Sequence, residues 1–111
     1  MEISQLGDDR IKVIFKGRLD TPGVDRVETR FVAATVPRGR HTLVDLSEVE
    51  FIGSLGVRMF ISVARGLGLR NARLLLISPQ TQVREVFDNV SLSDIIPICA
   101  DEAEADSALK A

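Results

Sequence analysis

Along this chain, stretches in which apolar residues alternate with polar ones are separated by stretches in which apolar residues recur every three or four positions. Ile11, Val13 and Phe15 occupy every second position, which predicts a strand with one buried face. The four aliphatic residues at 74–77 do not alternate, and this predicts a strand covered on both faces. Pro97 has no backbone N–H to donate, so a strand around it belongs at a sheet edge. The expected strands are residues 3–6, 11–16, 42–46, 74–77 and 95–98.

Helices are expected between these strands. Thr21 suits the N-cap of one helix, with Pro22 at its first position, and Ser78 suits the N-cap of another, with Pro79 after it. Apolar residues recur at helical spacing after each of these starts, and Pro37 ends the first helix. Two further helices are expected at about 55–68 and 101–109.

The order of these elements, β-β-α-β-α-β-α-β-α, predicts an α/β fold with a mixed sheet and helices packed around it. A helix between the strands at 42–46 and 74–77 makes that pair parallel, with a right-handed connection. A chain of 111 residues has room for one core of this kind, so residues 1–111 are expected to form a single domain.

Composition excludes several classes of function. The net charge is −2, from 14 basic and 16 acidic residues, so there is no basic excess to bind nucleic acid. No apolar run approaches the roughly 18–20 residues of a membrane span, and residues 1–4 lack the pattern of a signal peptide. Cys99 is the only cysteine, which suits a reducing compartment and a half-buried structural thiol. We therefore expect a cytoplasmic protein with no direct nucleic-acid contact and no membrane insertion.

Nothing in the sequence assembles catalytic chemistry. His41 is the only histidine, and it stands beside an expected strand start, where a surface or strand-edge role is favoured over that of a general base. There is no Cys and His cluster with zinc spacing and no phosphate-binding loop of the Gly-x-x-x-x-Gly-Lys-Ser/Thr type. The chain is therefore expected to be neither an enzyme nor a cofactor-binding protein.

The most informative short segment is Gly53-Ser54-Leu55-Gly56, at the start of the second expected helix. Ser54 is expected at the N-cap, near unpaired backbone N–H groups and the positive end of the helix dipole. A phosphate there would be tolerated without unfolding the domain, and the two glycines would let another backbone approach. Local sequence alone leaves two interpretations open: a plain helix cap, or a modification site.

The helix that follows carries two apolar stripes. The first is expected in the core, whereas the second could pack on a neighbouring helix or serve a partner, and the pattern does not decide between the two. The first stripe is Met59, Phe60, Val63 and Leu67, and the second is Val57, Ile61, Ala64 and Gly68.

Several motifs in the same order and spacing resemble the STAS family, and within it the bacterial anti-sigma factor antagonists. The family pattern has Gly-x-Leu-Asp after the second strand, as at 17–20, and Asp-Leu-Ser at the third strand, as at 45–47. It then has Phe-Ile-Asp-Ser-Ser-Gly before the second helix, where this chain has Phe-Ile-Gly-Ser-Leu-Gly at 51–56. The runs at 72–79 and 83–87 also resemble the family, so the similarity covers nearly the whole chain.

This resemblance implies a STAS-like domain in which Ser54 is the phosphoacceptor. In such a system, the unphosphorylated antagonist binds an ATP-dependent serine kinase that is also the anti-sigma factor, and this frees the sigma factor. The kinase phosphorylates the antagonist, and a serine phosphatase reverses the modification. Asp20 and Asp45 match family positions that are expected near one end of the sheet. The implied partner-binding residues are Asp20, Asp45, Gly53, Ser54, Leu55, Gly56, Val57, Arg58 and Ile61.

The chain departs from the family pattern on both sides of the serine. Gly53 replaces the usual Asp, and Leu55 replaces the usual second Ser. The alternative is therefore a phosphorylation-independent STAS subunit that scaffolds a sensory or lipid-transport complex.

Overall fold

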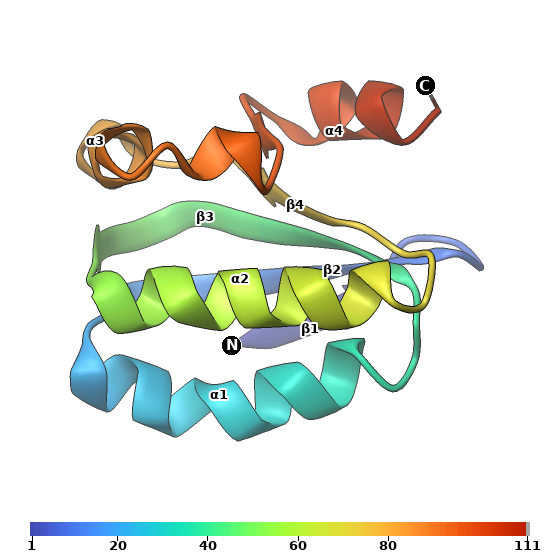
Figure 1. Ribbon diagram of the computed structural model, residues 1–111, viewed down its shortest axis with the longest axis horizontal. Coiled ribbons are helices and arrows are strands. Elements are labelled where there is room, and N and C mark those ends of the chain that lie inside the picture. Colours follow the sequence, from blue (N-terminus) through green and yellow to red (C-terminus); the bar gives the residue numbers. More distant parts are fainter. Residues whose placement is uncertain (111) are drawn as a thin grey trace.

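The computed structural model describes residues 1–110, which form a five-stranded mixed sheet in the spatial order β1-β2-β3-β4-β5 (Figure 1). The strands are β1 (Glu2–Gln5), β2 (Arg10–Leu19), β3 (His41–Ile52), β4 (Leu74–Ile77) and β5 (Ile98–Cys99). The helices are α1 (Thr21–Thr35), α2 (Ser54–Gly68), α3 (Thr81–Asn89) and α4 (Glu102–Lys110), with a short 3-10 helix, η1 (Leu92–Asp94). β1 pairs antiparallel with β2, and the other pairs are parallel. The predicted order of strands and helices is confirmed, with η1 as an addition.

The helices cover the sheet unevenly. α1 and α2 lie side by side on one side of it, α3 packs beside β3, and α4 packs on β4 and β5 (Figure 1). All four residues of β4 are buried, as predicted, because they alternate between the main core and a smaller cluster under α4. None of the helices in the described chain has the length and apolar character needed to span a bilayer.

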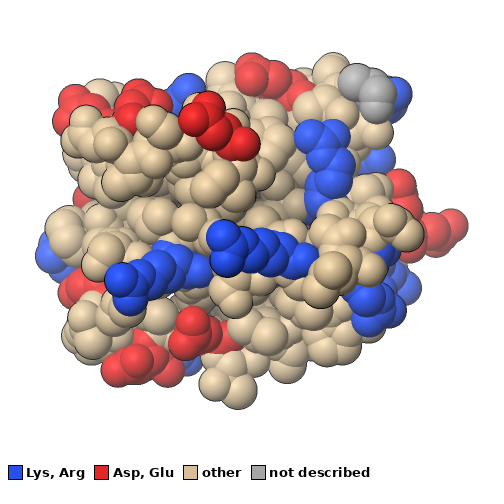
Figure 2. Space-filling model, viewed as in Figure 1, with Lys and Arg blue, Asp and Glu red and all other residues tan. Residues whose placement is uncertain are grey.

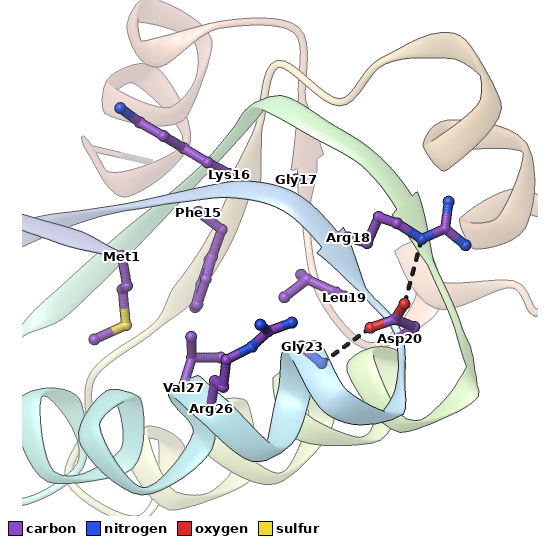
Figure 3. A pocket seen from close by; sticks show the side chains of 10 residues that line it. All are labelled: Met1, Phe15, Lys16, Gly17, Arg18, Leu19, Asp20, Gly23, Arg26 and Val27. Carbon is purple, nitrogen blue, oxygen red and sulfur yellow. Dashed lines mark hydrogen bonds and ion pairs between the residues drawn. The ribbon is translucent and has the colours of Figure 1, made fainter.

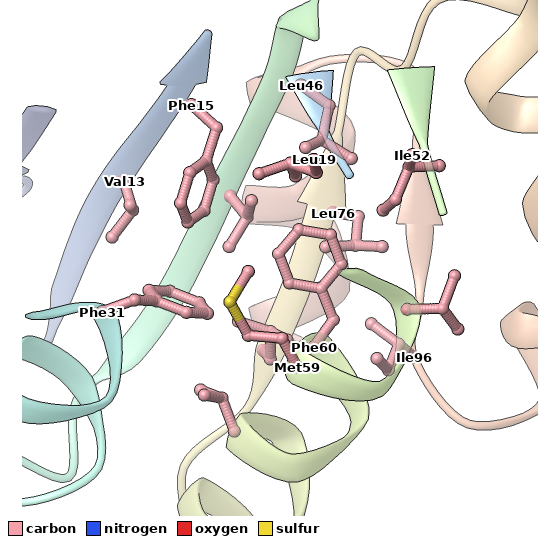
Figure 4. Packing of buried hydrophobic residues seen from close by; sticks show 14 of the residues in the cluster. Val13, Phe15, Leu19, Phe31, Leu46, Ile52, Met59, Phe60, Leu76 and Ile96 are labelled. Atoms are coloured by element: carbon pink, nitrogen blue, oxygen red, sulfur yellow. The ribbon is translucent and has the colours of Figure 1, made fainter. Parts of the chain in front are cut away.

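The main core is built around three phenylalanines. The rings of Phe15, Phe31 and Phe60 turn toward one another from β2, α1 and α2, with centroids 5.1–6.1 Å apart (Figure 4). Two of the three contacts are edge-to-face, the arrangement that the ring quadrupoles favour. This cluster fixes both helices against the sheet.

The two stripes of α2 differ in burial. All four residues of the predicted core stripe are at most 1% exposed, which confirms that prediction. In the second stripe, Val57 is buried, Ile61 and Ala64 are half-buried against the core, and Gly68 is exposed. Gly66, between the stripes, faces the side chain of Val36 at the end of α1, so one flank of α2 packs on its neighbour.

The third strand is longer than the sequence pattern predicted. We expected a strand at 42–46, a loop and a separate apolar Phe51-Ile52, but β3 continues to Ile52. Two register shifts against β2 keep the strands paired where strict alternation fails, and they bring Leu19 opposite Ile52. The ends of β2 and β3 are therefore level.

Two predictions near the C-terminus were wrong. Ser78 does not cap a helix: its backbone is left-handed, with φ 56°, its hydroxyl donates to the carbonyl of Ala100, and α3 begins only at Thr81. The last strand was expected at 95–98, but β5 contains only Ile98 and Cys99. The residues before it form η1 and a turn that leaves Ile95 53% exposed.

The edge position expected for the strand near Pro97 is confirmed, since β5 ends the sheet. Cys99 of this strand is buried rather than half-buried, and burial raises the pKa of its thiol.

Glycines allow the first turns of α1 and α2 to touch the strand ends. A Cβ on Gly23 would lie 2.0 Å from the carbonyl oxygen of Arg18. A Cβ on Gly56 would lie 2.7 Å from Cγ1 of Ile52 and 3.2 Å from the carbonyl oxygen of Leu19. Any side chain at either position would push a helix away from the sheet.

We predict that Gly23→Ala lowers the free energy of unfolding by roughly 3 kcal/mol, because the clash is with backbone that cannot move aside. Gly68→Ala is the matched control: nothing lies within 4 Å of its Cβ position, and this variant should gain about 0.5 kcal/mol from reduced entropy of the unfolded chain. Urea denaturation of both variants measures the difference. Equal stability of the two would contradict the close approach.

Candidate functional site

The first turns of α1 and α2 meet at one end of the sheet. β2 and β3 are parallel and end level, with Leu19 opposite Ile52, and a helix begins directly after each strand. The amide of Gly53 donates to the carbonyl of Leu19 at 3.0 Å, which ties the two strand-to-helix junctions together. The carboxyl end of parallel strands, where helix N-termini gather, is also where α/β proteins bind their ligands.

Asp20, not Thr21, caps α1. The Asp20 carboxylate accepts a hydrogen bond from the amide of Gly23 at 2.9 Å, and Thr21 and Pro22 are the first two residues of the helix (Figure 3). Both Asp and Thr are good N-cap residues, and the level strand ends select the residue directly after Leu19.

Arg18 holds the other oxygen of the same carboxylate. Its Nε lies 3.2 Å from Asp20 Oδ2, and its guanidinium carbon lies 4.3 Å from the centre of the Phe51 ring on β3. The hydrogen bond from Gly23 and the nearby guanidinium of Arg18 lower the pKa of Asp20 below its ordinary value. Arg18 and Phe51 lie within the sequence motifs at 17–20 and 51–56 but were not predicted as site residues, because their cation–π contact joins residues far apart in the chain.

Ser54 is the first residue of α2, and Gly53 is the N-cap. Gly53 has no side chain to cap the helix, and its carbonyl accepts from the amides of Gly56 and Val57. Ser54 is exposed, so its hydroxyl is open to solvent beside an N-terminal turn that lacks a side-chain cap. The expectation that Ser54 itself is the N-cap was wrong by one residue.

Apolar side chains flank the serine on the surface. Phe51 is 38% exposed and Leu55 is 37% exposed, which is high for such large hydrophobic residues. Together with Arg18, Asp20 and Ser54, they form what we call the switch surface. It offers a hydroxyl, an ion pair and two exposed apolar side chains from the ends of β2 and β3 and the start of α2.

Other predicted site residues divide by burial. Gly56 and Val57 face the core, so only their backbone could reach a partner. Arg58 is exposed and Ile61 is half-buried, and both lie farther along the outer side of α2, beside a shallow hollow.

Asp45 lies away from the switch surface. It stands opposite Ile14, seven residues before the end of β3, which is roughly 20 Å along the strand. Its carboxylate accepts from the amide of Ser47 at 2.9 Å and lies 3.6 Å from Nζ of Lys12, which also pairs with Glu102 of α4 at 3.1 Å. The expectation that Asp20 and Asp45 lie near one end of the sheet was therefore wrong, because β3 continues past Asp45 to Ile52, the residue opposite Leu19.

A hollow between β2 and α1 adjoins Asp20. Figure 3 shows the side chains of Phe15, Leu19 and Val27 in its wall and Arg26 beside it. β1 pairs with β2 only as far as Ile14. Within residues 1–110, the same edge of β2 after Ile14 therefore has no neighbouring strand. The hollow is continuous with the switch surface through Arg18 and Asp20.

Fold and surface together define a small α/β protein in which the first turns of two helices meet at the level ends of two parallel strands. The family model described as STAS domain matches residues 3–105. The chain therefore belongs to the STAS domain family.

Named relatives agree with this assignment. The chain is 28% identical over 104 residues to an anti-sigma-B factor antagonist of Listeria monocytogenes, covering 94% of this chain and 91% of that protein. It also resembles the solved structure of the anti-sigma factor antagonist SpoIIAA in its unphosphorylated form, with a TM-score of 0.79, 22% identity and coverage of 98% and 95%. The phosphorylated form of the Bacillus cell fate determinant SpoIIAA matches with a TM-score of 0.71, 20% identity and coverage of 97% of both chains.

We predict that Asp20→Ala lowers the midpoint of thermal unfolding by a few degrees, since it removes the cap of α1 and the partner of Arg18. Asp20→Asn keeps an oxygen for the Gly23 amide and should lose less.

Because the pKa of Asp20 is lowered in the folded state, its charge stabilises the fold above the unfolded pKa of about 4. That contribution disappears as the pH falls through the folded value. Melting curves from pH 7 to pH 2 should therefore converge for wild type and Asp20→Asn; a constant gap would contradict this role.

Proposed function

We propose that this chain is an anti-sigma factor antagonist in a phosphorylation-controlled partner switch. Its unphosphorylated form binds a serine-kinase anti-sigma factor and thereby releases the sigma factor. The kinase uses ATP to phosphorylate Ser54, which ends binding, and a serine phosphatase restores the hydroxyl. The observation that carries this proposal is the exposed Ser54 at the first position of α2, in a segment where Phe51 and Leu55 are also exposed.

The geometry supports a switch that acts by blocking contact. A phosphate on Ser54 would add about −1.5 to −2 charges and three acceptor oxygens at the centre of the switch surface. A partner that packs on Phe51 and Leu55 would have to bury this charge, and the cost of desolvating it would oppose binding. The fold would not have to change, because Ser54 is exposed and is not part of the buried core.

Gly53 bears on the same site. The family's usual Asp there would place a carboxylate beside the phosphate, whereas glycine leaves the first amides of α2 without a side-chain acceptor. A phosphate on Ser54 could therefore interact with the helix N-terminus without competition from a neighbouring carboxylate. The names of the curated relatives support the assignment as an antagonist. In this proposal, the chain acts by binding its partner and not by catalysis.

We predict that Ser54→Asp loses the anti-sigma factor and that Ser54→Ala retains it. A pull-down from the native host with wild type and both variants as baits, followed by mass spectrometry, identifies the partner. Titration calorimetry with the purified partner then measures the affinities. The expected result is that wild type and Ser54→Ala retain a kinase-like ATPase. The affinity of Ser54→Asp for this ATPase should be weaker by about tenfold or more. A partner held equally by all three would instead favour the phosphorylation-independent scaffold.

We also predict that Ser54→Asp does not lower the free energy of unfolding and raises it by up to about 1 kcal/mol, because an acidic residue in the first turn complements the helix dipole. Urea denaturation at low salt tests this, with Ser54→Asn as the control that should gain less, because its side chain has the shape of Asp without the charge. If Ser54→Asp were instead unfolded, its loss of binding would say nothing about a switch.

A further inference from the structure

The outer side of α2 carries a regular stripe that begins at Leu55 of the switch surface and runs along the helix. Its exposed residues follow one another at intervals of three, four, three and four positions. That spacing places side chains along a single seam of a helix, and it is the spacing along which a second helix packs. The stripe consists of Leu55, Arg58, Ser62, Arg65 and Leu69.

The two arginines of this stripe have no acidic partner. Neither Arg58 nor Arg65 forms an ion pair within residues 1–110, and α2 contains no Asp or Glu. Figure 2 shows two long basic side chains lying across the middle of this face, with uncharged surface around them and acidic residues above and below. In a chain of net charge −2, the stripe is a local positive feature.

Apolar residues border the arginines. Leu69, directly after α2, is 89% exposed, and Leu55 at the other end is 37% exposed. Ile61 lines the same hollow as both arginines, and Ile95 from the turn after η1 is 53% exposed beside α2, where it shares a second hollow with Ala64. Apolar contacts combined with arginine are typical of the central part of protein interfaces.

We propose that this stripe binds an acidic amphipathic helix of the anti-sigma factor, so that docking extends from Ser54 along the whole of α2. This inference rests on the proposed function. Arg58 and Arg65 are seven residues apart, which is about 10.5 Å along the axis. The partner helix therefore carries carboxylates one heptad apart, and its apolar residues meet Leu55, Ile61 and Leu69. Arginine suits this role because its planar fork binds a carboxylate through two hydrogen bonds.

The test uses the purified anti-sigma factor that wild type retains, and measures its affinity at low and high salt. Arg58→Glu combined with Arg65→Glu should weaken binding at low salt by about tenfold or more and make the remaining affinity less sensitive to salt. Arg38→Glu, an exposed reversal in the turn after α1, is the control and should stay close to wild type. Circular dichroism checks that the variants are folded.

A second measurement does not depend on substitution. Amide chemical shifts of the wild-type chain, followed while the anti-sigma factor is added, should change at 58–69 as well as at 51–56. Changes confined to 51–56, or a double reversal that binds like wild type, would overturn the proposal. The proposal would also be overturned if the double reversal left the affinity for the anti-sigma factor unchanged but abolished retention on heparin, which would indicate a polyanion site. The same holds if it dissociated a dimer of this chain, which would indicate a self-association surface.

The Ser54→Asp variant, run in parallel, separates the two ideas. If Ser54→Asp loses the anti-sigma factor but the double reversal keeps it, only the extended surface is wrong. If Ser54→Asp binds like wild type, the partner switch itself is wrong.

Discussion

The structure depends on the close contact between two helix starts and two strand ends. Only a hydrogen atom fits between Gly23 and the carbonyl of Arg18, where a Cβ would lie 2.0 Å from that oxygen. The amide of Gly53 reaches the carbonyl of Leu19 at 3.0 Å, and Gly56 packs against Ile52. These contacts hold α1 and α2 against level strand ends, so both first turns open on the same side of the molecule. The phenylalanine cluster underneath then fixes the helices along their length.

The two helix starts are chemically different, although they are built alike. Asp20 caps α1 with a charged side chain that Arg18 also holds, so this turn is satisfied within the chain. At α2, Gly53 supplies no side chain, and the hydroxyl of Ser54 stands in solvent at the first helical position. A modification that adds negative charge would therefore be favoured at the second start and not at the first. This asymmetry underlies the proposed switch, because charge can change at the surface while the core stays as it is.

Much of the fold could be predicted from the sequence because its cause is local. The alternation of Ile11, Val13 and Phe15 and the unbroken aliphatic run at 74–77 report burial directly, and both strands form as expected. Ser78 was misassigned because a serine before a proline suits a helix start, whereas a left-handed serine is uncommon and cannot be expected from the sequence. The hydroxyl of Ser78 donates to the carbonyl of Ala100, and this contact with a residue distant in the chain belongs to the turn and not to a helix start.

The candidate site could be predicted only in part, for the same reason. The segment around Ser54 was recognisable because its glycines and serine are contiguous. Asp45 was expected near Asp20 because the sequence pattern ends the third strand near Leu46, whereas β3 continues to Ile52 and carries the strand end away from Asp45. The contact between Arg18 and Phe51 depends on the register of β2 against β3, including two shifts that break the alternation. Residues joined across strands in this way become visible only once the register is known.

The central claim is that the exposed hydroxyl of Ser54 is the point at which this chain is switched. The most direct test is to incubate the purified chain with the captured kinase and ATP and to locate the phosphate by peptide mass spectrometry. We expect one phosphate, on Ser54, and a product that no longer binds the kinase. A phosphate on another residue, or a phosphorylated product that still binds the kinase, would contradict it.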